Sequence, residues 1–148
     1  MITMRRMGYA LLLIAAVGSI AVVVGGRAAG DGETPLGPGL VTVELRVEHS
    51  RFVPDRVVVQ PGTTVRFVIA NDDPIDHEFI VGPQDVHARH ELGTEQRHPP
   101  VPGEVSIPAA GEASTVYTFD GAGSVLFACH LPGHFAYGMR GTVVVATG

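Results

Sequence analysis

The chain has 148 residues, enough for one domain and an N-terminal extension. Its ten basic residues are all arginine and stand against 15 acidic residues, for a formal net charge of −5 at pH 7. Without residues 1–30 the balance is seven arginines to 15 acids, a net charge of −8. Such an acidic surface makes nucleic acid and anionic lipid poor partners, and a single cysteine excludes an internal disulfide.

The N-terminus has the pattern of an export segment. Arg5 and Arg6 precede an apolar run over residues 8–24, a basic region followed by a hydrophobic region. The run has about 17 residues, the short limit for crossing a bilayer. We therefore expect residues 1–26 to be either a signal peptide or a retained membrane anchor with its N-terminus in the cytoplasm. In both cases the rest of the chain is expected to be extracytoplasmic, with residues 8–24 as its only membrane contact.

Residues 27–39 are rich in Gly and Pro, which predicts a flexible linker before a domain over residues 40–148. Apolar and polar side chains alternate over residues 40–48 and 64–70, as in half-buried strands. Further strands are expected at 57–59, 77–81, 113–119, 124–129 and 141–146, and a short alternating stretch stands at 105–107. No stretch after the export segment shows helical periodicity. The pattern predicts an all-β fold, a β-sandwich with Greek-key connections, and leaves 82–111 as an unusually long loop.

The residues that carry chemistry gather in one run, Cys129-His-Leu-Pro-Gly-His134-Phe-Ala-Tyr-Gly-Met139. A thiolate, an imidazole and a thioether are soft ligands that favour copper, whereas zinc has little use for a thioether. Alternation along residues 124–129 is expected to turn Cys129 into the sandwich interior. A second imidazole is expected from another strand, and His77, at the start of an apolar strand, is the candidate.

In these segments the chain resembles the cupredoxins, the single-domain blue copper proteins that include plastocyanin, pseudoazurin and azurin. The resemblance spans about residues 40–146 and is carried by His77-Glu-Phe-Ile, Tyr117-Thr-Phe, Phe127-Ala-Cys129 and Cys129-x4-His134-x4-Met139. It implies a β-sandwich with one type 1 copper. By this resemblance His77, Cys129 and His134 are the equatorial ligands, and Met139 is the weak axial ligand.

Two positions depart from the pattern. Many relatives carry Asn directly after the first histidine, where this chain has Glu78, a carboxylate expected to lower the redox potential. His130 follows the cysteine as in multicopper oxidases, where the matching histidine binds a trinuclear cluster. That cluster also needs His-x-His pairs, and this chain has none. We therefore expect His130 to face outward and not to act as a ligand.

Two further surfaces are predicted around the loops. An apolar patch is expected where the His134 ring edge emerges, and a redox partner would dock there; its members are Leu131, Pro132, Phe135 and Tyr137. The acids near His77 form either a solvated loop or a recognition patch for a basic partner; they are Asp72, Asp73, Asp76 and Glu78.

A second metal site is a separate hypothesis for the long segment 82–111. His87, His90 and His98 lie there, and imidazoles at His-x2-His spacing suit copper or zinc. The competing interpretation is a polar, solvated loop.

Two functions from different classes fit these features. The first is a non-enzymatic carrier of single electrons between redox proteins, such as a cytochrome or a terminal oxidase. The alternative is copper binding for storage, resistance or delivery, which the extra histidines and the exported location favour. An oxidase subunit with a dinuclear copper centre needs two cysteines, and nitrite reductases and laccases need more histidine ligands or a second domain. We therefore expect no enzymatic activity.

Overall fold

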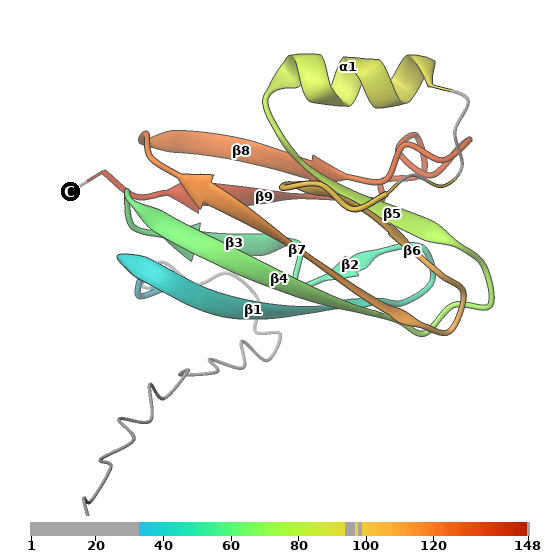
Figure 1. Cartoon of the computed structure of the whole chain (residues 1–148), viewed down its shortest axis with the longest axis horizontal. Helices are drawn as coiled ribbons and strands as arrows, with labels where there is room; N and C mark the ends of the chain where they lie inside the picture. Colours follow the sequence, from blue (N-terminus) through green and yellow to red (C-terminus); the bar gives the residue numbers. More distant parts are fainter. Residues whose placement is uncertain (1–32, 94–96, 98, 148) are drawn as a thin grey trace, which may run out of the picture.

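The structure, a computed structural model, describes residues 33–93, 97 and 99–147. The predicted export segment, residues 1–26, and His98 lie outside the described residues. Two β-sheets face each other, and one helix lies over the outer side of one of them (Figure 1). No helix in the described part of the chain is long and apolar enough to cross a membrane.

The first sheet contains the strands with the clearest alternation. Its members are β1 (Gly39–Val47), β2 (Phe52–Val53), β4 (Thr63–Asn71) and β7 (Glu112–Phe119), in the order β2-β1-β4-β7. β1 and β4 run parallel, so that Val43 lies opposite Phe67 and Leu45 opposite Ile69. These four side chains are fully buried, which confirms the faces that the alternation predicted.

The second sheet carries the elements that position the site. Its strands are β3 (Arg56–Val59), β5 (His77–Gly82), β6 (Glu104–Ile107), β8 (Gly123–Ala128) and β9 (Arg140–Val145), in the order β3-β9-β8-β5-β6. β5 and β8 pair antiparallel, with Ile80 opposite Ala128. Because antiparallel neighbours run in opposite directions, the start of β5 and the end of β8 meet at the same edge of the sandwich.

Aromatic side chains fill the space between the sheets. The rings of Phe79 and Phe127 lie 5.3 Å apart, and Phe52 packs edge-on against them at 5.6 and 5.5 Å. Such pairs contribute about 0.5–1.5 kcal/mol each beyond their buried area. Phe79 stands two residues after His77, and Phe127 two residues before Cys129, on the same faces of their strands. The packed rings therefore hold the strand ends from which these two side chains project.

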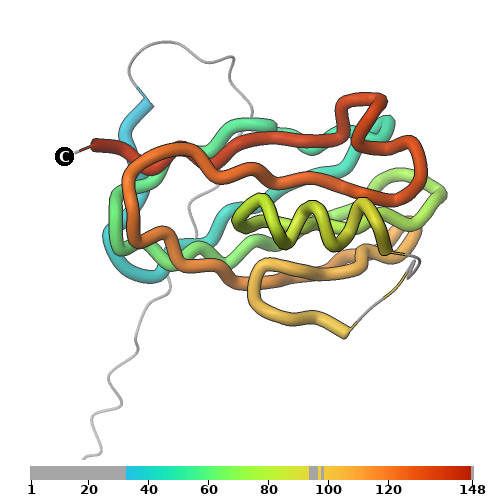
Figure 2. Tube along the Cα trace, turned by 90° about the horizontal axis from the view of Figure 1, so that it is seen from above, coloured from blue at the N-terminus to red at the C-terminus, as the bar shows by residue number. Residues whose placement is uncertain are grey.

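The segment predicted to be an unstructured loop contains a helix, α1 (Gln84–Leu92), that lies along the outer face of the second sheet (Figure 2). Only His87 of this helix is buried. Only three of its nine residues are apolar and none of these three is buried, so the helix has no apolar periodicity and the pattern did not predict it. Its attachment is polar: Arg89 and His90 both contact the carboxylate of Glu104 on β6, at 2.6 and 2.7 Å.

The predicted flexible linker is partly ordered. Leu36 packs against the core, its N–H donates to the Val58 carbonyl at 2.9 Å, and its carbonyl accepts from the Gln60 N–H at 2.8 Å. Residues 33–39 therefore belong to the folded domain, in contrast to the expectation, because an apolar residue between prolines docks beside β3. The remaining linker residues lie outside the described residues.

Substitution of Gly141 on β9 tests how closely this strand packs against its neighbours. A methyl group there would overlap both the ring of Phe127 and the Asp55 carbonyl, and backbone cannot move aside. We expect Gly141→Ala to lower the free energy of unfolding by about 2 kcal/mol, within the usual range for overpacking, as measured by urea denaturation. The matched variant Gly121→Ala, with no atom within 4 Å of the new methyl, should change it by less than about 0.5 kcal/mol. Equal midpoints for the two variants would contradict this packing.

Candidate copper site

Three predicted ligands converge at the edge where β5 begins and β8 ends. The Nδ1 atoms of His77 and His134 lie 3.2 Å apart, and the Sγ of Cys129 lies 3.2 Å from the same His134 nitrogen. All three ligand atoms fall within 4.8 Å of one another. His77 and Cys129 are fully buried, and His134 is partly exposed. This arrangement confirms that residues 57 positions apart in the chain meet at one point.

The loop after β8 is closed by its own backbone. The His134 N–H donates to the Leu131 carbonyl at 3.0 Å, and Gly133 between them has a φ of +87°, which favours glycine. The Met139 N–H then donates to the His134 carbonyl at 3.0 Å, and the Cys129 N–H donates to the Met139 carbonyl at 3.1 Å. These bonds fix Cys129 and His134 relative to each other from within the loop.

Met139 lies at the far end of the same loop. Its side chain is fully buried, in the apolar cluster that also contains Cys129. Gly138 before it adopts a φ of +92°, and its carbonyl accepts a hydrogen bond from Arg51 at 3.1 Å. The loop therefore delivers Met139 to the interior, where the resemblance places an axial thioether; its ligation of a metal stays a prediction.

His77 is oriented by a carboxylate that the sequence did not single out for this role. Its Nε2–H donates to Asp73 at 3.0 Å, which leaves the lone pair on Nδ1, the nitrogen that faces His134. Burial opposes ionisation of Asp73, but N–H donors from Ser50 and His49 and the His77 ring outweigh it and lower its pKa. Metal-bound histidines commonly show this outer-shell partner.

The protonation states of the three ligands are those of a site that loses one proton when a metal binds. Burial raises the pKa of the Cys129 thiol to about 12, so the metal-free thiol is protonated at neutral pH. Burial lowers the pKa values of His77 and His134, and His77 adds to the effect on His134, so both imidazoles are neutral there. Two neutral imidazoles and a sulfur that share a buried centre have the donor chemistry of copper.

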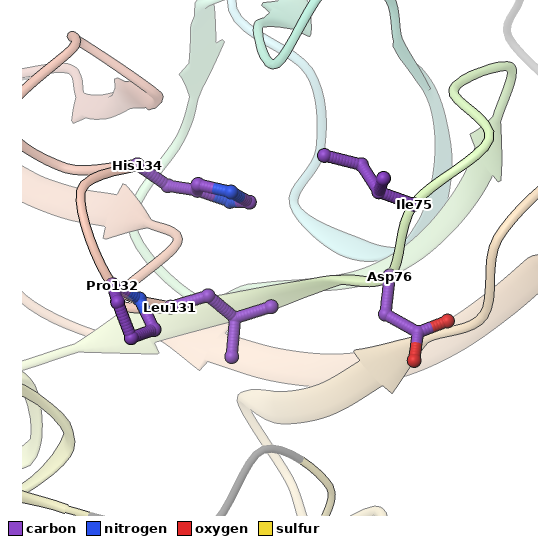
Figure 3. Close-up of a pocket in the computed structure, with 5 residues that line it drawn as sticks. All are labelled: Ile75, Asp76, Leu131, Pro132 and His134. Carbon is purple, nitrogen blue, oxygen red and sulfur yellow. The ribbon is translucent and has the colours of Figure 1, made fainter.

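Two of the four predicted docking residues line one pocket beside the copper ligands. Leu131, Pro132 and His134 line a pocket of about 300 Å³, and Ile75 and Asp76 face them from the loop before β5 (Figure 3). This part agrees with an apolar surface beside the ring of His134.

The lining of this pocket does not include Phe135 and Tyr137. Tyr137 is exposed, whereas Phe135 is partly buried, with its ring stacked 5.2 Å from that of His130 and Arg140 above it. The partner-docking role of the whole set stays a prediction.

The four acids near His77 do not form a single patch, because each is engaged within the fold. Asp72, Asp73, Asp76 and Glu78 contact, in order, Arg46, the His77 ring, Arg97 and the backbone N–H of His130. Glu78 is buried on the side of the sheet that α1 covers. A common recognition surface built from these carboxylates is therefore not present.

The predicted second site is also arranged differently. His87 and His90 lie on α1, His98 lies outside the described residues, and His90 contacts Glu104. His87 instead meets His130, with 2.8 Å between Nδ1 and Nε2. The side chain of His130 is only 1% exposed, so the expectation of an outward-facing residue was wrong.

The helix explains this burial, since alternation at the end of β8 turns His130 to the face that α1 covers. That alternation, with the Cys129 side chain directed inward, was the signal that could have placed it. Burial, with smaller effects from His87 and His90, lowers the pKa of His130 to about 4.

The fold and the buried His-Cys-His cluster define a cupredoxin-type copper protein. The model of the plastocyanin/azurin family of copper binding proteins matches residues 41–146. The chain therefore belongs to this family.

Curated relatives carry a more specific name. The chain is 38% identical over 130 residues to the copper-resistant cuproprotein CopI of Rubrivivax gelatinosus, which covers 81% of this chain and 79% of that protein. It is 26% identical over 137 residues to CopI of Pseudomonas aeruginosa, with 70% and 75% covered. Auracyanin B has a similar fold, with a TM-score of 0.58 at 24% identity over 78% of this chain and 92% of its own.

Copper binding should release one proton near neutral pH. The pKa of Cys129 is raised to about 12 while both imidazoles are already neutral, so the thiol alone loses a proton. Between about pH 7 and 9 the apparent affinity should rise about tenfold per pH unit, and it should fall more steeply below about pH 6, where the imidazoles also compete for protons. Calorimetry at pH 7.5 in buffers of different ionisation enthalpy measures the number released. Release of no proton would contradict a thiol ligand.

Proposed function

We propose that the chain binds copper outside the cytoplasm and serves copper resistance, without enzymatic activity. The observation that carries this proposal is the buried cluster of His77, Cys129 and His134, three soft or borderline ligands within 4.8 Å. The 38% identity to a protein named as a copper-resistant cuproprotein, over four fifths of the chain, supports the same function. The basic and apolar start of the sequence supports export.

The site is suited to hold copper as cargo. Its sulfur ligand is fully buried, so exchange with thiols or oxidants in the surroundings is hindered. The three ligand atoms lie within 4.8 Å of one another, and the Asp73 carboxylate selects the His77 tautomer whose lone pair is on Nδ1. A site whose ligands are held by their own hydrogen bonds loses less entropy on binding, and this strengthens binding.

Copper tolerance tests this function. A copper-sensitive bacterium that expresses the full chain should grow at higher copper concentrations than the same strain without it. Cys129→Ser removes the thiolate and should abolish the protection, together with the strong visible band expected of the cupric thiolate. His49→Asn changes an exposed side chain and keeps the backbone N–H that Asp73 accepts, and Asn tolerates the positive φ of this turn, so it is the matched control and should protect fully. Undiminished protection by Cys129→Ser would refute the proposal.

Electron transfer is the second candidate function. His134 is the ligand with partial exposure, and it opens on the pocket lined by Leu131 and Pro132. An imidazole edge at an apolar surface suits brief docking of a redox partner such as a cytochrome or a terminal oxidase. The rigid strands β5 and β8 behind the ligands would limit rearrangement between the two copper oxidation states.

A charge at this pocket should slow electron exchange. We expect Leu131→Glu to reduce the rate with a reduced cytochrome by about tenfold or more, because a buried carboxylate is costly at an apolar contact. Stopped-flow spectroscopy of the copper-loaded protein measures the rate, and an unchanged visible spectrum confirms an intact site. Val116→Glu, which places the same charge on exposed β7, is the matched control. Equal rates for the two variants would argue against docking at His134.

A further inference from the structure

A second pair of imidazoles lies beneath α1, on the opposite face of the second sheet from Cys129, which follows β8. The Nδ1 of His87 and the Nε2 of His130 are 2.8 Å apart, and their ring centroids are 5.1 Å apart. Both side chains are nearly inaccessible, at 3% exposure for His87 and 1% for His130. The approach of the two nitrogens is closer than the 3.2 Å between His77 and His134 in the first site.

The hydrogen bonds of this pair leave one buried nitrogen without a partner. His87 Nε2–H donates to the Leu126 carbonyl at 3.2 Å, so the lone pair of His87 is on Nδ1. His130 must then donate Nε2–H to that lone pair, which turns its own Nδ1 into an acceptor. Within the described part of the chain no donor reaches this buried Nδ1. Buried polar atoms are rarely left unpaired, so the pair is incomplete as it stands.

We propose that His87 and His130 bind a second copper ion, in the cupric state, through Nδ1 of His87 and Nε2 of His130. The ion binds a lone pair on each of these two nitrogens, so the proton on Nε2 of His130 moves to Nδ1 of the same ring. That nitrogen lies 3.8 Å from the carboxylate of Glu91, whose half-exposed side chain can close the gap. Both rings then have an acceptor on the nitrogen that does not bind metal, Leu126 for one and Glu91 for the other, as metal-bound histidines usually do.

The spacing admits one ion between the two rings. Metal–imidazole bonds of about 2.0 Å reach both nitrogens across the 2.8 Å that their hydrogen bond now spans. Water is left to fill the other positions, and a set of imidazole nitrogens and water oxygens is typical of tetragonal cupric ion.

The surroundings provide access and negative charge. His87 lines a pocket of about 410 Å³ together with Gln84 and Leu126, a route by which an ion reaches the pair. The buried carboxylate of Glu78 accepts from the His130 backbone N–H at 2.7 Å. His90 is not a ligand here, because its Nε2 is held by Glu104 at 2.7 Å. This site differs from the predicted set of His87, His90 and His98, and it goes beyond the function proposed above.

Copper titration of the full chain tests the site. With cupric ion alone, the wild type should bind two ions per chain, measured by elemental analysis after desalting. One gives the thiolate band, and the other adds a tetragonal signal in electron paramagnetic resonance without strong colour. His87→Gln and His130→Gln should each bind one ion and keep the band. Cys129→Ser should lose the band and keep the colourless ion, which separates this proposal from the first site.

The controls are two histidines that the proposal does not use. His49→Asn and His98→Ala should both bind two ions. Binding of a single ion by the wild type, or of two by His87→Gln, would overturn the proposal.

If a glutamine variant loses the visible band, a measurement on the wild-type protein tests the proposal instead. One equivalent of mercuric ion first occupies the thiolate site, since soft metals prefer sulfur. Cupric ion added afterwards should bind, and electron spin echo modulation should show two imidazole nitrogens on it. A bound ion with fewer than two imidazole nitrogens, or no bound ion, overturns the proposal.

Discussion

The antiparallel pairing of β5 with β8 is the constraint on which the site depends. Its register sets Ile80 opposite Ala128, so His77 and Cys129 project from neighbouring strand ends into the same buried space. A slip of one residue would turn Cys129 to the opposite face and remove the sulfur from the centre. The aromatic packing of Phe79 and Phe127 resists such a slip, because both rings would have to leave the core. The chemistry of the site is in this sense a consequence of strand register.

Burial then determines how the ligands behave. It keeps the thiol of Cys129 protonated and the imidazoles of His77 and His134 neutral, so the metal-free centre carries no charge of its own. Two carboxylates lie next to this centre: Asp73, which is held by backbone donors and contacts the far nitrogen of His77, and Glu78, which accepts from the His130 N–H. A neutral, soft and enclosed centre discriminates against hard cations, because the desolvation of such ions would not be compensated there. This selectivity fits a protein that must retain copper among more abundant metals.

Much of this was accessible from the sequence, and the exceptions have physical reasons. Period-two alternation predicted the buried faces of β1 and β4, and the inward direction of Cys129 followed from the same rule. The cysteine loop carries three ligand types at fixed spacing, so local sequence identified it. The helix over Gln84–Leu92 was missed because it is anchored by polar contacts, which leave no periodic signal. The role of Asp73 was missed because its contact with His77, four residues along the chain, depends on the shape of the loop before β5, and the burial of His130 was missed because it depends on α1, a segment far away in the chain.

Backbone hydrogen bonds close the loop from Cys129 to Met139. The shape of the metal site and the stability of the domain therefore depend on different parts of the chain. These hydrogen bonds run within the loop itself, from His134 to Leu131, from Met139 to His134 and from Cys129 to Met139. The rest of the protein supplies His77, the two attachment points of the loop, the Arg51 side chain that donates to the Gly138 carbonyl and the Glu78 carboxylate that accepts from the His130 N–H. Substitutions inside the loop can therefore change the metal centre while the two sheets fold as before. In this architecture, evolution can change the short ligand loop while the β-sandwich stays the same.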